Sequence, residues 1–308
     1  MEILIIGAGA MGGLFAALLA PFAEVCLYTT NSDHAAVINR DGLTVTGKDG
    51  MVRRSAVRVL SDPRHYDRRA DLIIIFTKAR STTEAAQVAL PLLKAEGLVL
   101  TLQNGLGNLE RIVAVVGAER AVVGITSQAA TLVGPGKVLH AGSGSTVLAA
   151  GPEQFIRVAA IVALFNRAGI DTQIAEDGDS LLWSKLIVNV GINALTALLR
   201  VPNGTLTQIP ECEGLMAQAV AEAVAVAQAL HVNLPYEQQL DRVRQVCGLT
   251  AANRASMLQD ILQGAPTEID VINGAIVAQG REAGIPTPVN LLLTQLIKAL
   301  EATAPYRI

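Results

Sequence analysis

The sequence is poor in the residues that build metal centres and disulfide frameworks. Among its 308 residues are only four histidines, which are scattered, and three distant cysteines, Cys26, Cys212 and Cys247. No CxxC pair or other metal-ligand spacing occurs, so we expect no metal site, and reduced thiols in a cytoplasmic protein. The scattered histidines also give little support to a Ser-His-Asp triad.

Charge of either sign is also scarce. Charged residues make up 17% of the chain, and the net charge is −3. No basic stripe is available to neutralise phosphates, so we expect no nucleic-acid partner. The apolar run 3–19 has no Lys or Arg before Arg40 and contains glycines, which argues against a signal peptide. The apolar stretch 215–234 carries polar residues at helical spacing, so we predict a buried helix there and no membrane association.

Apolar residues make up 51% of the chain, enough for two domains with separate cores. In the first half, apolar strands alternate with helices, which predicts a mostly parallel sheet. A hairpin is expected around Lys48-Asp49-Gly50. The expected strands are 3–6, 24–29, 43–46, 52–59, 72–76, 98–102 and 121–124, and the expected helices are 10–20 and 84–94.

From Gly178 onward the periodicity is helical, and strand signals almost disappear. The expected helices are 179–200, 211–231, 236–263, 267–283 and 289–302. We therefore predict an α/β fold: a Rossmann-type, doubly wound dinucleotide-binding domain over 1–174, then an all-α domain over 175–308. A cleft between two such domains is a usual place for ligands.

A glycine-rich loop, Gly7-Ala8-Gly9-Ala10-Met11-Gly12, follows the first predicted strand and opens a helix. In this context Gly7 permits a tight bend, Gly9 lets the backbone approach a pyrophosphate, and Gly12 lets the helix pack closely. We therefore predict a dinucleotide site here. The second strand ends at Tyr28-Thr29-Thr30, without the acid typical of NAD sites or the cation typical of NADP sites, so either cofactor stays open.

A polar stripe lies on an otherwise apolar predicted helix. Lys185, Asn189 and Asn193 recur every fourth residue and so share one face. Such groups are costly to bury unless something hydrogen-bonds them, and a small oxygen-rich substrate would do so. A positioned ammonium can stabilise the charge that hydride transfer develops on a carbonyl oxygen and then donate the proton. A surface lysine, with amides that join neighbouring helices, is the structural alternative.

Three further residues lie where ligands are often bound. Lys78 closes a buried strand at the carboxyl edge of the predicted sheet. Asn104 follows the next strand, as a ligand contact or as part of a plain turn. Glu268 lies in the first turn of the predicted helix 267–283, which Thr267 and Asp270 would open with a capping box. Glu268 would then either interact favourably with the positive end of the helix dipole or bind a ligand.

Several segments, in order over nearly the whole chain, resemble the ketopantoate reductase (2-dehydropantoate 2-reductase) family. The two C-terminal blocks, 253–260 and 267–274, are highly specific, whereas the glycine loop alone is not. The other segments are Gly7 to Gly12, Phe76-Thr77-Lys78-Ala79, Gln103-Asn104-Gly105-Leu106-Gly107, Trp183-Ser184-Lys185 with Asn189 and Asn193, and Pro202-Asn203-Gly204.

The resemblance implies an NADPH-dependent reduction of ketopantoate to (R)-pantoate in pantothenate and coenzyme A biosynthesis. It also implies a helical domain similar to the C-terminal domain of 6-phosphogluconate dehydrogenase. Lys185 resembles the catalytic general acid, and Glu268 the catalytic acid that closes the site. The implied substrate contacts are Asn104, Lys185, Asn189, Asn193, Asn203, Asn253 and Ser256. The implied cofactor contacts are Gly7, Ala8, Gly9, Ala10, Met11, Gly12, Thr30, Lys78, Asn104, Ala130 and Glu268.

One departure concerns the cofactor. The family often has Arg where this chain has Thr30, so NADP(H) is expected and NAD(H) stays open. Another 2-keto or hydroxy acid dehydrogenase on the same fold is the alternative enzyme. A non-catalytic nucleotide-sensing protein is the alternative from another class, although a sensor has no need of Lys185 as proton donor. The expected partner is a small-molecule substrate, and a homodimer stays open.

Overall fold

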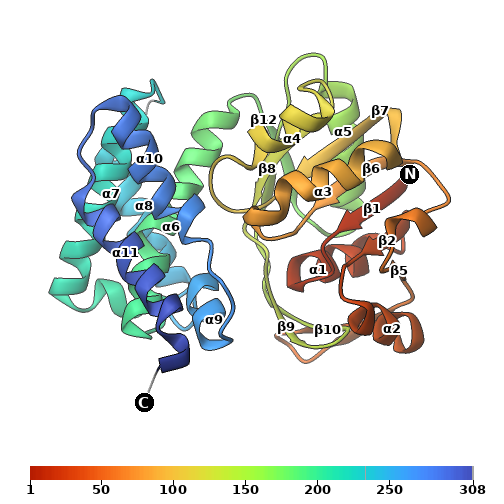
Figure 1. Ribbon diagram of the computed structural model, residues 1–308, viewed down its shortest axis with the longest axis horizontal. Coiled ribbons are helices and arrows are strands. Elements are labelled where there is room, and N and C mark those ends of the chain that lie inside the picture. Colours follow the sequence, from red (N-terminus) through yellow and green to blue (C-terminus); the bar gives the residue numbers. More distant parts are fainter. Residues whose placement is uncertain (233, 307–308) are drawn as a thin grey trace. The chain divides into compact units, whose positions relative to one another are not determined.

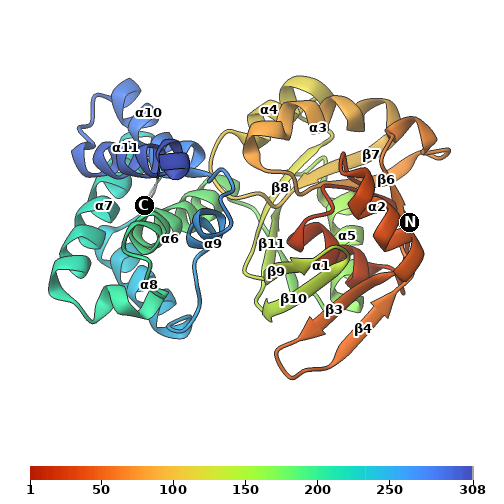
Figure 2. The same ribbon diagram turned by 60° about the horizontal axis from the view of Figure 1, so that its bottom comes forward.

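Two compact units make up the protein. The computed structural model describes residues 1–232 and 234–306. Unit 1 comprises residues 1–103 and 107–178, and unit 2 comprises residues 104–106 and those from 179 on (Figures 1 and 2). The predicted boundary at 174/175 lies within strand β12 (Thr172–Ala175), whose Ala175 pairs with Ala149 of the neighbouring strand, and the two units divide after Gly178.

An eight-stranded sheet forms the centre of unit 1, in the order β12-β11-β8-β7-β6-β1-β2-β5. Neighbouring strands are parallel except β8 and β11, which confirms the predicted mostly parallel sheet. The bounds are β1 (Glu2–Ile6), β2 (Glu24–Tyr28), β5 (Arg58–Leu60), β6 (Ala70–Ile75), β7 (Leu93–Thr101), β8 (Ala121–Thr126) and β11 (Thr146–Ala149).

Helices cover both faces of this sheet, and strand β1 shows why. Ile3 and Ile5 lie in a core cluster with residues of α1 (Ala10–Leu19), α2 (Ser32–Asp41) and α5 (Phe155–Arg167). Leu4 and Ile6 lie in a second cluster with residues of α3 (Thr82–Ala89) and α4 (Asn108–Val116). Because successive side chains of a strand point to opposite faces, a strand covered on both sides is continuously apolar.

A second, four-stranded sheet packs against α1 in the order β4-β3-β10-β9. The predicted hairpin is present as β3 (Leu43–Gly47) and β4 (Val52–Ser55), but its second arm ends before residue 59. Residues 58–60 instead form β5 and pair with β2, because Val57 and Val59 are buried in the main core. Strands β9 (Ala129–Gly134) and β10 (Lys137–Gly142) complete this sheet.

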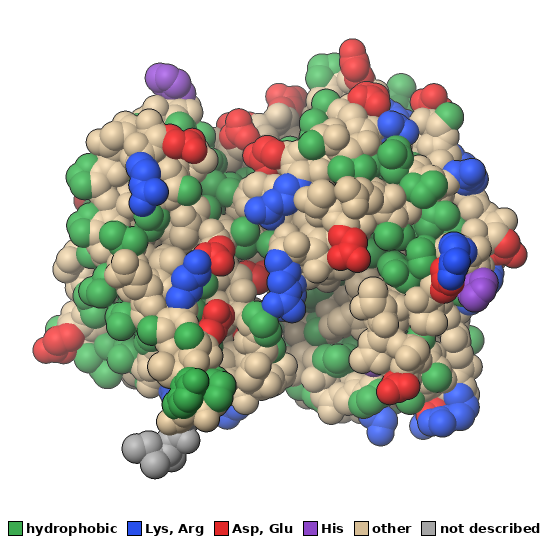
Figure 3. Space-filling model, viewed as in Figure 1, with side chains coloured by type: hydrophobic (Ala, Val, Ile, Leu, Met, Phe, Trp, Pro, Cys, Tyr) green, Lys and Arg blue, Asp and Glu red, His purple; other side chains and the backbone are tan. Residues whose placement is uncertain are grey.

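Unit 2 is helical, as predicted. Its helices are α6 (Gly178–Leu199), α7 (Pro210–Ala229), α8 (Tyr236–Leu249), α9 (Ser256–Leu262), α10 (Asn273–Ala283) and α11 (Pro288–Ala302). By length and composition, α6 is the one helix in the described part of the chain that could cross a membrane. However, 67% of its apolar window is buried inside the protein, which is typical of a core helix. Figure 3 shows acidic and basic side chains interspersed over the face in view.

Short 3-10 turns complete the chain. They are η1 (Pro63–His65), η2 (Ala79–Ser81), η3 (Leu90–Leu92), η4 (Asn203–Thr207), η5 (Ile269–Val271) and η6 (Ala304–Tyr306). The predicted helix 236–263 is wrong as one element, because it breaks between α8 and α9. There the carbonyl oxygens of Ala251 and Asn253 accept hydrogen bonds from the backbone of Gly204 and Asn203 instead of continuing a helix.

The predicted helix 267–283 is also divided, and its capping box is wrong. Helix α10 begins only at Asn273, after the turn η5. Thr267 Oγ1 accepts from the backbone of Ile269, two residues on, rather than capping a helix. Asp270 forms an ion pair with Lys298, with 2.6 Å between Asp270 Oδ1 and Lys298 Nζ. Glu268 therefore lies before a 3-10 turn and not in the first turn of an α-helix.

Candidate active site

The glycine loop joins β1 to α1 with the geometry that the sequence predicted. Gly7 has a φ of +110°, and a Cβ there would lie 2.8 Å from the backbone of Phe76. A Cβ on Gly12 would collide with the carbonyl oxygen of Gly7. Gly9, at the N-cap of α1, is exposed, and a Cβ there would have nothing within 4 Å. The open backbone at Gly9 and the start of α1 together form the kind of surface that accepts a phosphate.

His34, on α2, fastens this loop to the rest of unit 1, and sequence reasoning missed it. Its Nε2 lies 2.9 Å from the carbonyl oxygen of Ala8, and the side chain is buried. Since a carbonyl oxygen only accepts, Nε2 carries the proton in this hydrogen bond. Helix α2 was itself not predicted, and a lone histidine in sequence indicates no particular partner.

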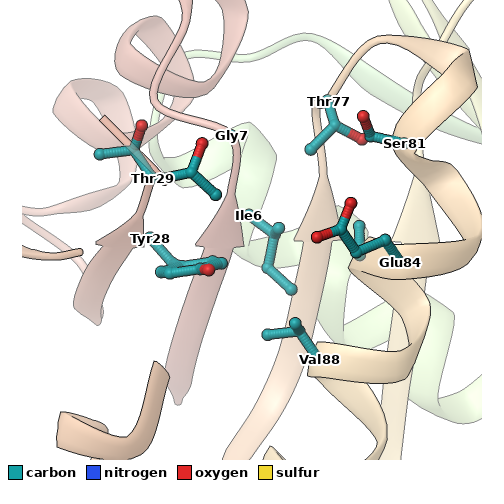
Figure 4. A pocket seen from close by; sticks show the side chains of 10 residues that line it. Ile6, Gly7, Tyr28, Thr29, Thr77, Ser81, Glu84 and Val88 are labelled. Atoms are coloured by element: carbon teal, nitrogen blue, oxygen red, sulfur yellow. The ribbon is translucent and has the colours of Figure 1, made fainter. Parts of the chain in front are cut away.

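A pocket of about 530 Å³, open solvent included, lies where β1, β2 and β6 end (Figure 4). We call it the strand-end pocket. Thr30, predicted to meet the cofactor, is one of its lining residues, together with Ser81 and Glu84, which sequence reasoning missed. Figure 4 shows the Glu84 carboxylate, carried by α3, turned toward the pocket. The full lining is Ile6, Gly7, Tyr28, Thr29, Thr30, Thr77, Ser81, Glu84, Ala85 and Val88.

Lys78 lies just beyond the end of β6, at the carboxyl edge predicted for it, and is half-buried. The turn that carries it is held by buried Gln103. Gln103 Nε2 donates to the carbonyl oxygen of Thr77 at 2.7 Å and to Thr82 Oγ1 at 3.0 Å. Arg111 Nη1 adds a hydrogen bond to the carbonyl oxygen of Ala79 at 3.1 Å. Both backbone carbonyls that flank Lys78 are thus fixed by side chains.

In unit 2, Lys185 lies on α6 and is half-buried. Burial lowers its pKa from the usual value to about 8, and the negative charge of Glu268 opposes that shift. The charge of Glu268 thus acts on Lys185, although these two predicted catalytic residues are far apart in the sequence. A lysine with a pKa near neutrality can exist in both protonation states, as a general acid must.

Asn189 and Asn193 continue the stripe, and their amides are unusual. In both, the side-chain nitrogen is buried and has no hydrogen-bond partner. Buried amide groups are rarely left this way, because each unpaired donor costs about 1–3 kcal/mol. The alternative, in which these amides join neighbouring helices, is thus not supported for either nitrogen. Two donors without partners on the lysine's face provide a recognition surface for oxygen atoms.

Asn203 and Asn253 are brought together at the end of α6. The backbone of Asn203 donates to the carbonyl oxygen of Asn253 at 3.0 Å. Asn203 Nδ2 donates to Thr250 Oγ1 at 2.9 Å, whereas its Oδ1 is buried without a partner. Ser256 is exposed and begins α9, which lies next to α6 in both ribbon views (Figures 1 and 2).

The segment Asn104–Leu106 belongs to unit 2 because it pairs with the chain near Glu268. The backbone of Leu106 donates to the carbonyl oxygen of Val271 at 3.0 Å. Gly105 has a φ of +87°, and a Cβ there would lie 2.6 Å from Val271 Cγ2. Asn104 therefore precedes a tight packing contact and does not lie in a plain exposed turn. Ala130, also predicted, lies in β9 and packs against the core of unit 1.

Comparison with known proteins now adds to this geometry. The ketopantoate reductase PanE/ApbA family model matches residues 3–153, and the ketopantoate reductase PanE/ApbA C-terminal model matches residues 178–301. The 2-dehydropantoate 2-reductase of Halobacterium salinarum is 38% identical over 301 residues, which are 97% of this chain and 98% of that protein. The chain belongs to the ketopantoate reductase family.

Solved structures that are similar to this chain confirm the fold. A PanE/ApbA family ketopantoate reductase from Ralstonia eutropha JMP134 is 31% identical, with a TM-score of 0.89 over 98% of this chain and 99% of that one. The ternary structure of D-mandelate dehydrogenase with NADH and anilino(oxo)acetate is 30% identical, with a TM-score of 0.93 over the same shares. Members of this fold thus include more than one named dehydrogenase.

Proposed function

We propose that this chain reduces 2-dehydropantoate (ketopantoate) to (R)-pantoate in pantothenate and coenzyme A biosynthesis, with Lys185 as general acid. One observation carries the proposal. Lys185 has a pKa of about 8, and it shares a face of α6 with two buried amide nitrogens that lack partners. An oxygen-rich 2-keto acid supplies the hydrogen-bond acceptors that these two amide nitrogens lack.

The cofactor we propose is a reduced nicotinamide dinucleotide, held by unit 1. The residues fit such a group: Gly9 is open to a pyrophosphate, and Gly7 and Gly12 leave no room for larger residues. Thr30, Lys78, Ala130 and, from unit 2, Asn104 and Glu268 are assigned to it by family resemblance. NADPH is the donor that this resemblance implies, and NADH is the donor that Thr30 leaves open.

When bound, the dinucleotide supplies the hydride that adds to C2 of the keto acid. As the carbonyl π bond breaks toward oxygen, the Lys185 ammonium stabilises the developing negative charge and gives its proton to that oxygen. The product is the 2-hydroxyl group, and the neutral amine regains a proton from water. With a pKa of about 8, roughly ten lysines are protonated for each neutral one at pH 7.

The other residues bind and orient the keto acid. Amide nitrogens of Asn189 and Asn193 are donors for carboxylate and hydroxyl oxygens, and they add no charge. Glu268 keeps Lys185 protonated at a higher pH than burial alone would allow. Asn203 Oδ1, a buried acceptor without a partner, suits a substrate hydroxyl. Asn104, Asn253 and Ser256 are further substrate contacts that the family resemblance assigns.

A second candidate is a dehydrogenase for another 2-keto acid, such as an aryl one. The 0.93 TM-score with D-mandelate dehydrogenase favours it, since a change of apolar pocket residues redirects substrate choice on one fold. The deciding experiment is oxidation of NADPH and NADH by the purified protein. Ketopantoate would be compared with unbranched and aryl 2-keto acids.

The proposal expects the highest kcat/KM with ketopantoate. Faster turnover of an aryl or unbranched 2-keto acid would replace ketopantoate as the substrate but keep the reaction type. Tight dinucleotide binding without turnover of any 2-keto acid would favour a non-catalytic nucleotide-sensing protein. The variant Lys185→Ala, with unchanged dinucleotide binding, provides the matched control for Lys185-dependent chemistry.

A further inference from the structure

The strand-end pocket has an apolar floor and a polar rim. Ile6, Ala85 and Val88 provide apolar surface, and Figure 4 shows Ile6 and Val88 lower in the view than Thr29 and Ser81. Thr29 and Ser81 contribute hydroxyl groups above them. An apolar floor beneath hydrogen-bonding groups suits a flat heterocycle joined to a sugar. The end of the second strand is also where dinucleotide folds place the ribose next to the adenine.

The charge that lines this pocket is negative. Of its lining residues, only Glu84 is charged at neutral pH, and its side chain is exposed and turned toward the pocket (Figure 4). The pKa of Tyr28 is raised, first by burial and then by the negative charge of Glu84. The field of the carboxylate thus reaches across the pocket to β2.

The arginine that follows β5 does not offset this charge. Arg64 lies beyond the strand that pairs with β2, but its guanidinium is bound to Asp62, with 2.7 Å between Nη2 and Oδ2. Asp62 also accepts from the Arg64 backbone at 2.9 Å. A 2′-phosphate of NADPH carries close to two negative charges, and it is usually met by Arg or Lys. Among the residues that line this pocket, its neighbours would be hydroxyl groups and a carboxylate, and Lys78, the cation that the family resemblance assigns to the cofactor, is not one of them.

We propose that the strand-end pocket selects the dinucleotide without a 2′-phosphate, so that NADH is preferred to NADPH. The hydroxyls of Thr29, Thr30 and Ser81 suit a free ribose diol, and Glu84 repels a phosphate. The identity of the ligand as a nicotinamide dinucleotide rests on the proposed function, but the preference itself is a property of unit 1 alone.

Equilibrium binding to the full-length protein, without any keto acid, tests this inference. NADH and NADPH would be titrated separately and followed by their own fluorescence. Adenosine diphosphate ribose and its 2′-phosphate would be titrated by calorimetry. We expect each unphosphorylated ligand to bind at least about tenfold more tightly than its 2′-phosphate counterpart, because a phosphate near the Glu84 carboxylate is disfavoured several-fold per charge.

Two variants test the residues named. Glu84→Gln should raise NADPH affinity about threefold to tenfold and change NADH affinity less, because it removes one charge–charge repulsion. Thr30→Arg should raise NADPH affinity about tenfold, since a guanidinium binds phosphate oxygens in pairs. Glu153→Gln, the same change at an exposed residue outside the pocket, controls for net charge. It should leave the ratio of the two affinities unchanged.

Equal or tighter binding of NADPH by the unaltered protein would overturn the inference. So would a Glu84→Gln variant whose affinity ratio matches that of Glu153→Gln. Because no keto acid is present, these results are independent of the proposed reaction. A protein that prefers NADH but fails to turn over ketopantoate would refute only the substrate. One that reduces ketopantoate but prefers NADPH would refute only this inference.

Discussion

Gln103 Nε2 donates a hydrogen bond to the carbonyl oxygen of Thr77 across 2.7 Å. These two residues follow neighbouring parallel strands, β7 and β6, and the bond ties the ends of those strands together. Thr101 Oγ1 in turn donates to Gln103 Oε1 at 2.9 Å, so the amide is held on both sides. A side chain satisfied in this way is a rigid support for the turn that presents Lys78.

Gln103→Leu removes this support and leaves the partly buried carbonyl oxygen of Thr77 without its donor. We expect a loss of about 1–3 kcal/mol in the free energy of unfolding, together with weaker dinucleotide binding. Urea unfolding and a dinucleotide titration measure the two effects. Gln87→Leu, at an exposed position on α3, is the control and should change neither. Unchanged stability in Gln103→Leu would show that the hydrogen bond contributes nothing in solution.

The buried strands and the helical half could be predicted because their residues repeat with clear periods. Ile3 to Ile6 and Leu72 to Ile75 are continuously apolar, and strands covered on both faces require this. The sequence also predicts the two hairpin arms that pair as β3 and β4. In contrast, the sequence predicts residues 58 and 59 as part of the hairpin arm 52–59, because alternation cannot tell which sheet a strand joins. Only the burial of Val57 and Val59 in the main core decides it.

Residue spacing predicts the candidate site where its residues share one helix, whereas residues that meet across the fold are either named by the family resemblance alone or missed. Lys185, Asn189 and Asn193 are found by their spacing alone. The hydrogen bond from His34 to Ala8 and the turn of Glu84 toward the strand-end pocket depend on α2 and α3 packing beside the sheet. No local pattern encodes such contacts. The break before α9 likewise depends on hydrogen bonds to η4, which lies far earlier in the chain.

The pH dependence of reduction provides a test of Lys185. Its pKa of about 8 means that the protonated form, the proposed acid, is lost as the pH rises through that value. We expect kcat/KM for the 2-keto acid to fall above pH 8 in steady-state assays. Lys185→Arg keeps its charge at these pH values, so its much lower rate should show no such fall. An identical alkaline decline in Lys185→Arg would assign the titration to another group.

Stability should depend on the same group with a defined sign. The pKa of Lys185 is lowered on folding, so between about pH 8 and its ordinary value of 10.5 the unfolded chain binds more protons. The contribution of Lys185 to the free energy of unfolding therefore rises with pH between about pH 8 and pH 10.5. Below pH 8 Lys185 destabilises the folded protein most. Lys185→Met should thus be more stable than the unaltered protein at pH 7, and this difference should shrink toward pH 10.

The single tryptophan provides the measurement for that comparison. Trp183 is buried on α6, two residues before Lys185, so its fluorescence during urea unfolding follows unit 2. Groups that titrate equally in both proteins cancel when the two are compared at each pH. A difference that stays constant from pH 7 to pH 10 would mean that folding does not lower the pKa of Lys185.

The two kinds of buried asparagine in unit 2 should respond in opposite directions to the same substitution. Asn193 has a buried side-chain nitrogen without a partner, whereas Asn290 Nδ2 donates to Ala219 O at 3.0 Å and to Glu222 Oε2 at 2.8 Å. Asn193→Leu removes an unsatisfied donor, so we expect unit 2 to gain about 1 kcal/mol in the free energy of unfolding. Asn290→Leu leaves the hydrogen-bond acceptors of Asn290 without their donor and should lower the free energy of unfolding by about 2 kcal/mol or more.

If Asn193 binds the substrate, the substitution Asn193→Leu should impair activity even though it raises the free energy of unfolding. We expect Asn193→Leu to raise KM for the 2-keto acid at least tenfold while dinucleotide affinity stays the same, because the proposed function assigns that amide to the keto acid and not to the dinucleotide. Trp183 fluorescence and steady-state kinetics on one preparation give both quantities. A variant that is more stable and equally active would show that the unpaired amide serves neither folding nor binding. A less stable one would show that the amide nitrogen finds a partner in solution.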